Sequence, residues 1–163
     1  MKHFFITLTL LLVHAQSQLF AQPTGLPGVF LIGEHEDQYL PLAQEHPGSF
    51  MALYNNDINL AYRGWSELLM DIEDYAIDLD FDIKGVKLWL NIYFNADGTI
   101  SNLAFFPKPN SRNVPNDQLV GFFKNFIRQY HLSETAEVGF QHSASASFPT
   151  FFHRTNPETA RNN

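Results

Sequence analysis

Apolar and polar side chains alternate along residues 86–94, and this is the clearest pattern in the chain. Five apolar side chains occupy every second position: Val86, Leu88, Leu90, Ile92 and Phe94. A period of two is typical of a strand with one buried face. The Asp97-Gly98 pair within Asn95–Thr99 can supply the positive φ of a tight turn. Residues 100–106 then return to Pro107, which has no amide hydrogen for a strand ladder. The pattern predicts a β-hairpin over residues 86–107.

Apolar side chains three and four residues apart predict an amphipathic helix on each side of this hairpin. The first helix, expected from Gly64 to Ile77, has its stripe at Trp65, Leu68, Leu69, Ile72 and Ala76. The second has its stripe at Leu119, Phe122, Phe123, Phe126, Ile127 and Tyr130. We expect Asn116 or Asp117 to cap the start of the second helix.

Further strands are predicted at both ends of the sequence. Alternation from Phe140 to Phe148 predicts a last strand, and its small Ala144 and Ala146 would let Gly121 of the second helix pack closely against it. The apolar runs Val29–Ile32 and Ser49–Tyr54 predict two N-terminal strands, while residues 38–44 have no decisive periodicity.

Together these elements predict one α+β domain over residues 22–155. Its expected form is a small antiparallel sheet with two helices on one face, preceded by a β-rich N-terminal region at residues 29–59. The helix, hairpin, helix and strand unit would occupy residues 62–153, followed by a disordered polar tail at 156–163. A chain of 163 residues that is 45% hydrophobic can bury such a core.

The first 21 residues have the pattern of a secretory signal. Met1-Lys2-His3 precedes an apolar run, Phe4–Val13, and small residues at Ser17 and Ala21 offer cleavage positions. The run has about 10 residues, whereas a membrane-spanning helix needs about 20. We therefore expect a periplasmic or secreted protein with no stable membrane insertion after cleavage.

Charge and cysteine content narrow the possible partners. The net charge is −7, which disfavours nucleic acid and anionic membrane surfaces. The chain has no cysteine, so it has neither a disulfide framework nor a thiolate metal site.

The order of elements from Trp65 to about Phe151 resembles the TonB C-terminal domain family of Gram-negative envelopes. Its most specific part is the run Lys84-Gly85-Val86, the alternating strand and the turn Asn95-Ala96-Asp97-Gly98-Thr99. The membrane anchor and the proline-rich spacer of TonB are absent from this sequence, so energy transduction is not implied. What the resemblance implies is the fold, an envelope setting and a partner that adds a strand to a sheet edge.

No catalytic, metal or cofactor site is predicted. Asp78, Asp80 and Asp82 begin like a calcium loop, but Ile83 and Trp89 replace the glycine and glutamate that such a loop needs. Of the seven histidines, the five that follow the predicted signal segment are expected on the surface, without a zinc set among them: His35, His46, His131, His142 and His153. The alternating Ser143, Ser145 and Ser147 predict a polar sheet face rather than a nucleophile.

The candidate binding residues lie on the hairpin and in the loop after it. If the even-numbered hairpin positions face the helices, then Trp89 and Tyr93 face outward and could form a contact surface. The alternative is that residues 29–54 pack over them as a second layer. The loop residues Lys108, Asn110 and Arg112 could contribute to binding, or the loop could be a structured connector.

These observations favour a non-enzymatic module, a monomer or weak dimer, that binds an envelope protein or peptide. The alternative is a small periplasmic enzyme or ligand carrier with a site between the N-terminal strands and the hairpin.

Overall fold

The computed structural model describes residues 25–151, and in this part of the chain it has a five-stranded sheet and four helices. The elements in chain order are β1 (Val29–Leu31), α1 (Glu36–Glu45), β2 (Gly48–Ser49), α2 (Phe50–Leu53), α3 (Ile58–Asp78), β3 (Lys87–Phe94), β4 (Ile100–Pro107), α4 (Asn116–Gln129) and β5 (Phe140–Ser147). The predicted α+β class is confirmed. The predicted signal segment, residues 152–155 and the predicted tail lie outside the described residues.

The predicted hairpin is confirmed as β3 and β4, which pair antiparallel. Its turn depends on Gly98, which has φ 91°, and on Asp97, whose carboxylate accepts hydrogen bonds from the amide and the hydroxyl of Thr99. These bonds hold the pKa of Asp97 below its usual range. The register shifts near the turn, because Tyr93 pairs with Asn102 while Phe94 pairs with Ile100. Ser101 is therefore the extra residue of a β-bulge.

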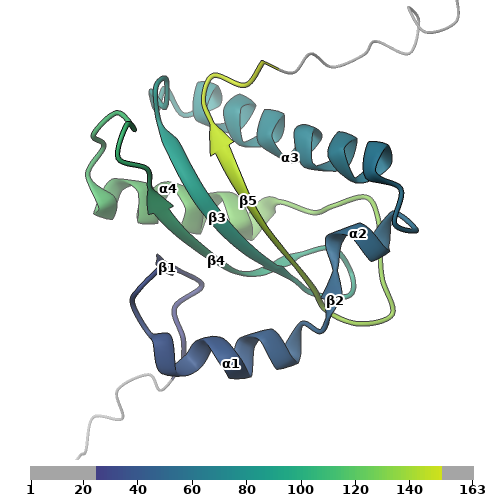
Figure 1. Cartoon of the computed structure of the whole chain (residues 1–163). Coiled ribbons are helices and arrows are strands. Elements are labelled where there is room, and N and C mark those ends of the chain that lie inside the picture. The colour runs from purple at the N-terminus through teal and green to yellow at the C-terminus, as the bar shows by residue number, and fades with distance from the viewer. Residues whose placement is uncertain (1–24, 152–163) are drawn as a thin grey trace, which may run out of the picture.

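The sheet order is β1-β4-β3-β5-β2. The predicted last strand is confirmed as β5, which pairs antiparallel with β3 along its whole length. The two edge strands are parallel to their neighbours, β1 to β4 and β2 to β5, so the sheet is mixed and the prediction of an antiparallel sheet holds only for its three central strands. The N-terminal segment thus runs from one edge of the sheet to the other, and α1 crosses between them (Figure 1).

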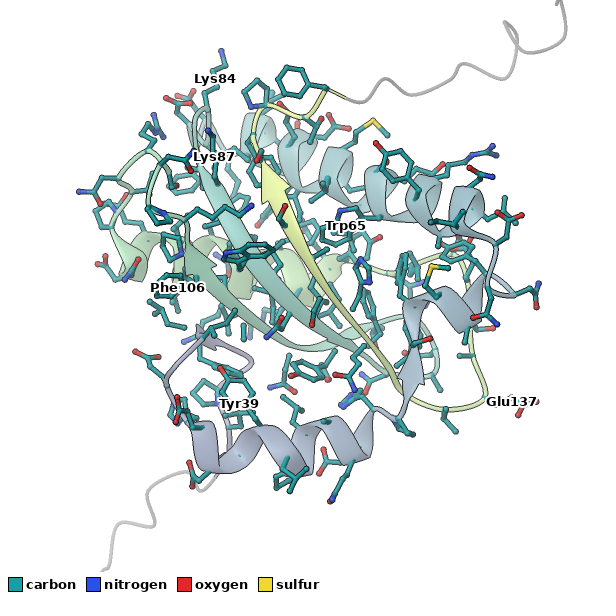
Figure 2. The ribbon with its side chains drawn as sticks, viewed as in Figure 1. Tyr39, Trp65, Lys84, Lys87, Phe106 and Glu137 are labelled. Carbon is teal, nitrogen blue, oxygen red and sulfur yellow. The ribbon has the colours of Figure 1, made fainter. Side chains whose placement is uncertain are left out.

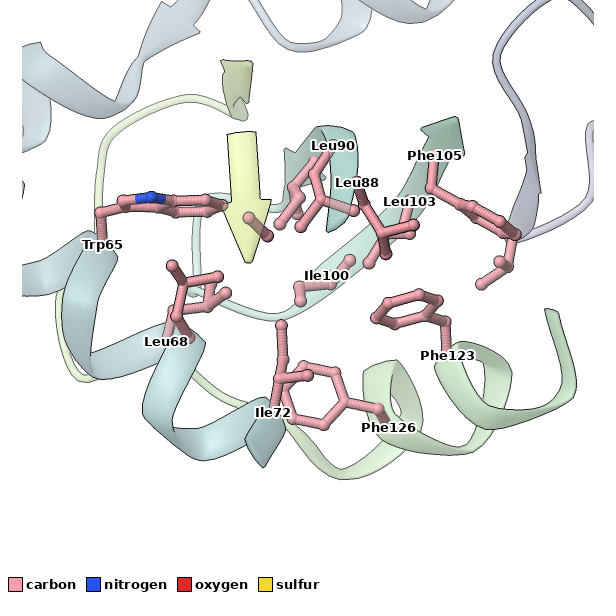
Figure 3. Packing of buried hydrophobic residues seen from close by; sticks show 14 of the residues in the cluster. Trp65, Leu68, Ile72, Leu88, Leu90, Ile100, Leu103, Phe105, Phe123 and Phe126 are labelled. Carbon is pink, nitrogen blue, oxygen red and sulfur yellow. The ribbon is translucent and has the colours of Figure 1, made fainter. Parts of the chain in front are cut away.

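The main core lies between the inner face of the sheet and the helices α3 and α4. Figure 3 shows side chains of both helices meeting those of the hairpin, and the most deeply buried include Leu68, Ile72, Leu88, Leu90, Leu103, Phe105 and Phe123. Full burial of one such side chain contributes about 1.5–3 kcal/mol. None of the helices within residues 25–151 has the length and apolar composition that crossing a bilayer demands.

The N-terminal region contains less strand than predicted. The strand at Val29–Ile32 is confirmed as β1, but the strand predicted at Ser49–Tyr54 is wrong, because Phe50–Leu53 form helix α2. The Ser49 hydroxyl accepts a hydrogen bond from the Ala52 amide at 3.1 Å and so caps this helix. The undecided residues 38–44 belong to α1.

The two helices begin at other residues than predicted. Helix α3 starts six residues earlier, at Ile58, because the Asp57 carboxylate accepts hydrogen bonds from the amides of Asn59 and Leu60. Helix α4 has Pro115 at its N-cap position and no side-chain cap, so the predicted capping by Asn116 or Asp117 is wrong.

The predicted packing of Gly121 is also wrong. Gly121 is exposed, and a Cβ there would meet no atom within 4 Å. Helix α4 lies against β4 and β1 rather than β5. The closely packed helical glycine is Gly64 of α3, which lies against the ring of Tyr54.

Candidate functional site

The outer face of the sheet, opposite α3 and α4, carries the polar and aromatic residues of the alternating strands. Across β4, β3 and β5 the register forms three neighbouring rows: Phe106, Trp89 and Ser145; Ala104, Asn91 and Ser143; Asn102, Tyr93 and Gln141. One row further, Lys87 lies beside Ser147 and accepts a backbone hydrogen bond from Lys108. The predicted polar face of the last strand is therefore part of a larger surface.

Helix α1 covers the half of this face that contains Tyr93. The Tyr93 side chain is only 5% exposed and packs in a second cluster with Phe30, Leu42 and Ala104. Burial raises the pKa of the Tyr93 hydroxyl. The prediction of an exposed Tyr93 is wrong. The alternative, a second layer formed by residues 29–54, holds for this half of the face.

No other element of residues 25–151 covers the second half of the face, and here the predicted outward position of Trp89 is confirmed. Trp89 is 52% exposed, and its cross-strand neighbour Phe106 is 47% exposed. The ammonium of Lys108 lies 4.1 Å from the centroid of the Trp89 ring, within range of a cation–π interaction. Figure 2 shows Phe106 and Lys87 toward the end of the sheet that lies away from α1 and Tyr39. We call Lys87, Trp89, Phe106 and Lys108 the open patch.

Of the three predicted loop residues, only Lys108 belongs to this patch. The Arg112 guanidinium binds the Asp82 carboxylate, with Nη1 2.5 Å from Oδ2, and it also donates to the Asp82 carbonyl. The Ser111 hydroxyl accepts a hydrogen bond from the Lys87 amide at 2.9 Å. Asn110 is exposed at the intervening turn. The loop is therefore a structured connector, which was the second of the two interpretations drawn from the sequence.

The prediction that all five histidines are surface residues is wrong for two of them. His46 is 5% exposed, and its Nδ1 lies 2.9 Å from the carbonyl oxygen of Leu42. His142 packs between the rings of Phe50 and Trp65, and burial lowers its pKa below the ordinary value. His35 and His131 are exposed, and His153 lies outside the described residues.

His46 forms a contact with Ser101 that the sequence pattern did not indicate. The His46 Nε2 atom lies 3.0 Å from the Ser101 Oγ atom, and the Ser101 hydroxyl also donates a hydrogen bond to the Tyr93 carbonyl oxygen over 3.2 Å. A histidine ring beside a serine hydroxyl is the pair of groups found in an activated nucleophile. However, the ring is enclosed by α1 and Tyr93, which leaves a substrate little access. The pair instead links the N-terminal segment to the bulge of β4.

Metal binding finds no support in the described residues. Within residues 25–151 no three His, Cys, Asp or Glu side chains are placed to hold an ion. Asp78 ends helix α3, Asp80 occupies a turn with φ 52°, and Asp82 is bound to Arg112. The alternate aspartates therefore do not form a loop around one cation.

Acidic residues gather on the opposite side of the molecule from the open patch. A hollow of about 350 Å³ between α3 and α4 is lined by Asp71, Asp74, Tyr75, Asp78, Phe126, Gln129 and Tyr130. Burial, and to a smaller extent the charge of Asp71, raises the pKa of the Tyr130 hydroxyl. Negative charge is thus concentrated along α3, away from the lysines of the hairpin.

No family model matches the chain, and neither a curated protein nor a solved structure matches it. The resemblance to the TonB C-terminal domain family therefore rests on the order of elements and on the sequence pattern of residues 84–99.

Proposed function

We propose that this protein is a non-enzymatic binding module that contacts a protein or peptide through the open patch. The observation that carries the proposal is the pair of large aromatic side chains, Trp89 and Phe106, exposed side by side on adjacent strands of the sheet. Aromatic residues dominate the energetics of protein interfaces, and truncation of a central one typically costs about 2 kcal/mol or more. The sheet holds both rings in place before binding, which lowers the entropic cost of association.

A second docking mode is supported by the edge of β5. Its neighbour β2 pairs only with Phe140 and Gln141, so within the described residues no strand lies beside His142–Ser147. A partner could add a strand there, as the resemblance to the TonB family implies. Ser145 of this edge is beside Trp89, so a strand on β5 would still approach the open patch.

The alternative function, a small enzyme or ligand carrier, has less support. Its site was expected between the N-terminal segment and the hairpin. That interface is filled by packed side chains of Phe30, Leu42, Tyr93 and Ala104, and by the buried His46. An enzyme needs a concave site with converging polar groups, whereas a binding module needs only a surface.

Export is part of the same proposal, because the partner is expected in the envelope. N-terminal sequencing of the protein recovered from its producing cells tests this. A mature chain that starts at Gln18 or Gln22 would support cleavage after Ser17 or Ala21. A chain that retains Met1 and remains in the cytoplasm would contradict it.

The contact surface is tested by the double substitution Trp89→Ser/Phe106→Ser. Wild-type protein immobilised on beads should retain a partner from envelope extract, and the double variant should bind that partner at least about 30-fold more weakly. A matched control replaces two other exposed apolar residues, Ile77→Ser/Leu79→Ser, and should leave capture unchanged. Circular dichroism should show that both variants are folded. Equal capture by wild type and the Trp89/Phe106 variant would contradict the proposal.

A further inference from the structure

The cations of this acidic protein are unevenly distributed. The chain has 17 acidic and 10 basic residues, but Lys84, Lys87, Lys108 and Arg112 all lie at one end of the hairpin. Arg112 is bound to Asp82, and Lys84 lines a hollow together with Glu73, Asp80 and Asp82. Lys87 and Lys108 are therefore the two cations that belong to the open patch.

Two of these lysines occupy facing positions at the ends of adjacent strands. The Lys108 amide donates to the Lys87 carbonyl at 2.9 Å, and both side chains follow the outward alternation of Trp89 and Phe106. Like charges in facing positions destabilise a sheet. Neither lysine forms an ion pair with a carboxylate of residues 25–151. A ligand with negative charge would relieve this repulsion.

We infer that the partner of the open patch is an acidic peptide segment, in which carboxylates flank a large apolar side chain. This inference rests on the proposed function and names the chemistry of its partner. The apolar side chain would pack on Trp89 and Phe106, while the carboxylates would pair with Lys87 and Lys108. Carboxylates paired with ammonium groups form charge-assisted hydrogen bonds, which are stronger than those between neutral groups.

The charge of the whole protein disfavours an anionic membrane as the partner. An anionic membrane would be repelled by the rest of a chain with net charge −7. A short acidic peptide contacts only the surface around Lys87 and Lys108 and avoids this repulsion.

The test is a selection of random dodecapeptides displayed on phage against the mature protein, with counter-selection on Trp89→Ser/Phe106→Ser. The enriched sequences should contain at least two Asp or Glu residues around an aromatic or aliphatic residue. Binding of the best synthetic peptide, followed by fluorescence anisotropy, should weaken about tenfold or more in Lys87→Ala/Lys108→Ala. It should weaken similarly between 50 and 300 mM NaCl, as charge screening requires (~14 Å Debye length falling to ~6 Å).

The matched control is Lys124→Ala/Arg128→Ala, which removes two exposed cations from α4 and should leave the affinity within about twofold. Circular dichroism should confirm that each variant is folded. If the enriched peptides were neutral or basic and their binding still depended on Trp89, then the inference of an acidic partner would be overturned while the proposed function would stand. A failure to enrich peptides beyond the Trp89/Phe106 variant would overturn both. Tighter binding to heparin fragments, or to vesicles of phosphatidylcholine with 30% phosphatidylglycerol, would overturn the peptide in favour of that polyanion.

Discussion

Two glycines inside helices should respond in opposite ways to the same substitution. Gly64 lies in α3 and Gly121 in α4, both away from the helix ends. Alanine at an exposed helix position is more favourable than glycine by about 1 kcal/mol, because glycine loses more backbone entropy on folding. Gly121 has no atom within 4 Å of its added Cβ, so Gly121→Ala should stabilise the fold by about that amount.

Gly64→Ala should lose this gain because its space is occupied. The added Cβ would lie 2.0 Å from Tyr54 Oη and 2.5 Å from Tyr54 Cζ. Ordinary contact needs about 3.5 Å or more, so the ring must move by roughly 1.5 Å. The ring cannot move freely, since it packs 5.2 Å from the ring of Phe50. Overpacking of this kind costs about 1–3 kcal/mol, so the two alanine variants should differ by that amount.

Urea denaturation followed by circular dichroism measures the difference. The midpoint should rise for Gly121→Ala and stay level or fall for Gly64→Ala, with unchanged slopes. Adding Tyr54→Phe to Gly64→Ala removes the nearest atom, which is buried with no hydrogen-bond partner in the described residues, and should recover part of the loss. If Gly64→Ala were stabilised as much as Gly121→Ala, then the packing of Tyr54 on α3 would be refuted.

Further predictions concern the two histidines His142 and His46. Burial lowers the pKa of His142 below 6.5, so the unfolded chain binds a proton at this residue at a higher pH than the folded chain does. The contribution of His142 to stability should therefore be complete above about pH 6.5 and should decline as the pH falls toward the folded-state pKa. Melting temperatures of His142→Gln should lack this decline, whereas the exposed control His131→Gln should keep it. His46→Ala should destabilise the fold by about 1–3 kcal/mol, because Ser101 and the Leu42 carbonyl lose a buried partner. Urea midpoints no lower than that of wild type would show that the link to the N-terminal segment is not structural.

Much of the fold could be predicted because one side of each main element is buried. The alternation in β3 and β5 and the stripes of α3 and α4 all arise from contact with the main core between the helices and the sheet. The Asp97-Gly98 turn could be predicted from the local conformational preferences of these two residues alone. The segment Ser49–Tyr54 was misread because a short apolar run has no period that separates strand from helix, and the cap formed by Ser49 decided for the helix.

The binding surface could be predicted only in part, because its limits depend on remote segments. The alternation placed Trp89 and Tyr93 on the outer face, but whether each is exposed depends on where α1 crosses that face. Helix α1 contains Pro41 and has only a weak helical spacing of apolar residues, so neither the helix nor its place on the sheet could be predicted from the sequence. Phe106 could have been found from alternation along the return strand, although the bulge at Ser101 obscures the register of the pair.

The crossing of the N-terminal segment has a consequence for solubility. Its two strands lie at opposite edges of the sheet, β1 along β4 and β2 at the start of β5, while α1 covers Tyr93 and Ala104 between them. A chain shortened to begin at α3 would expose an unpaired β4 edge together with an apolar face. Bare edges of this kind act as templates for strands of other copies. The first quarter of the described chain therefore occupies positions that another molecule would otherwise fill, and we expect it to protect the protein from aggregation.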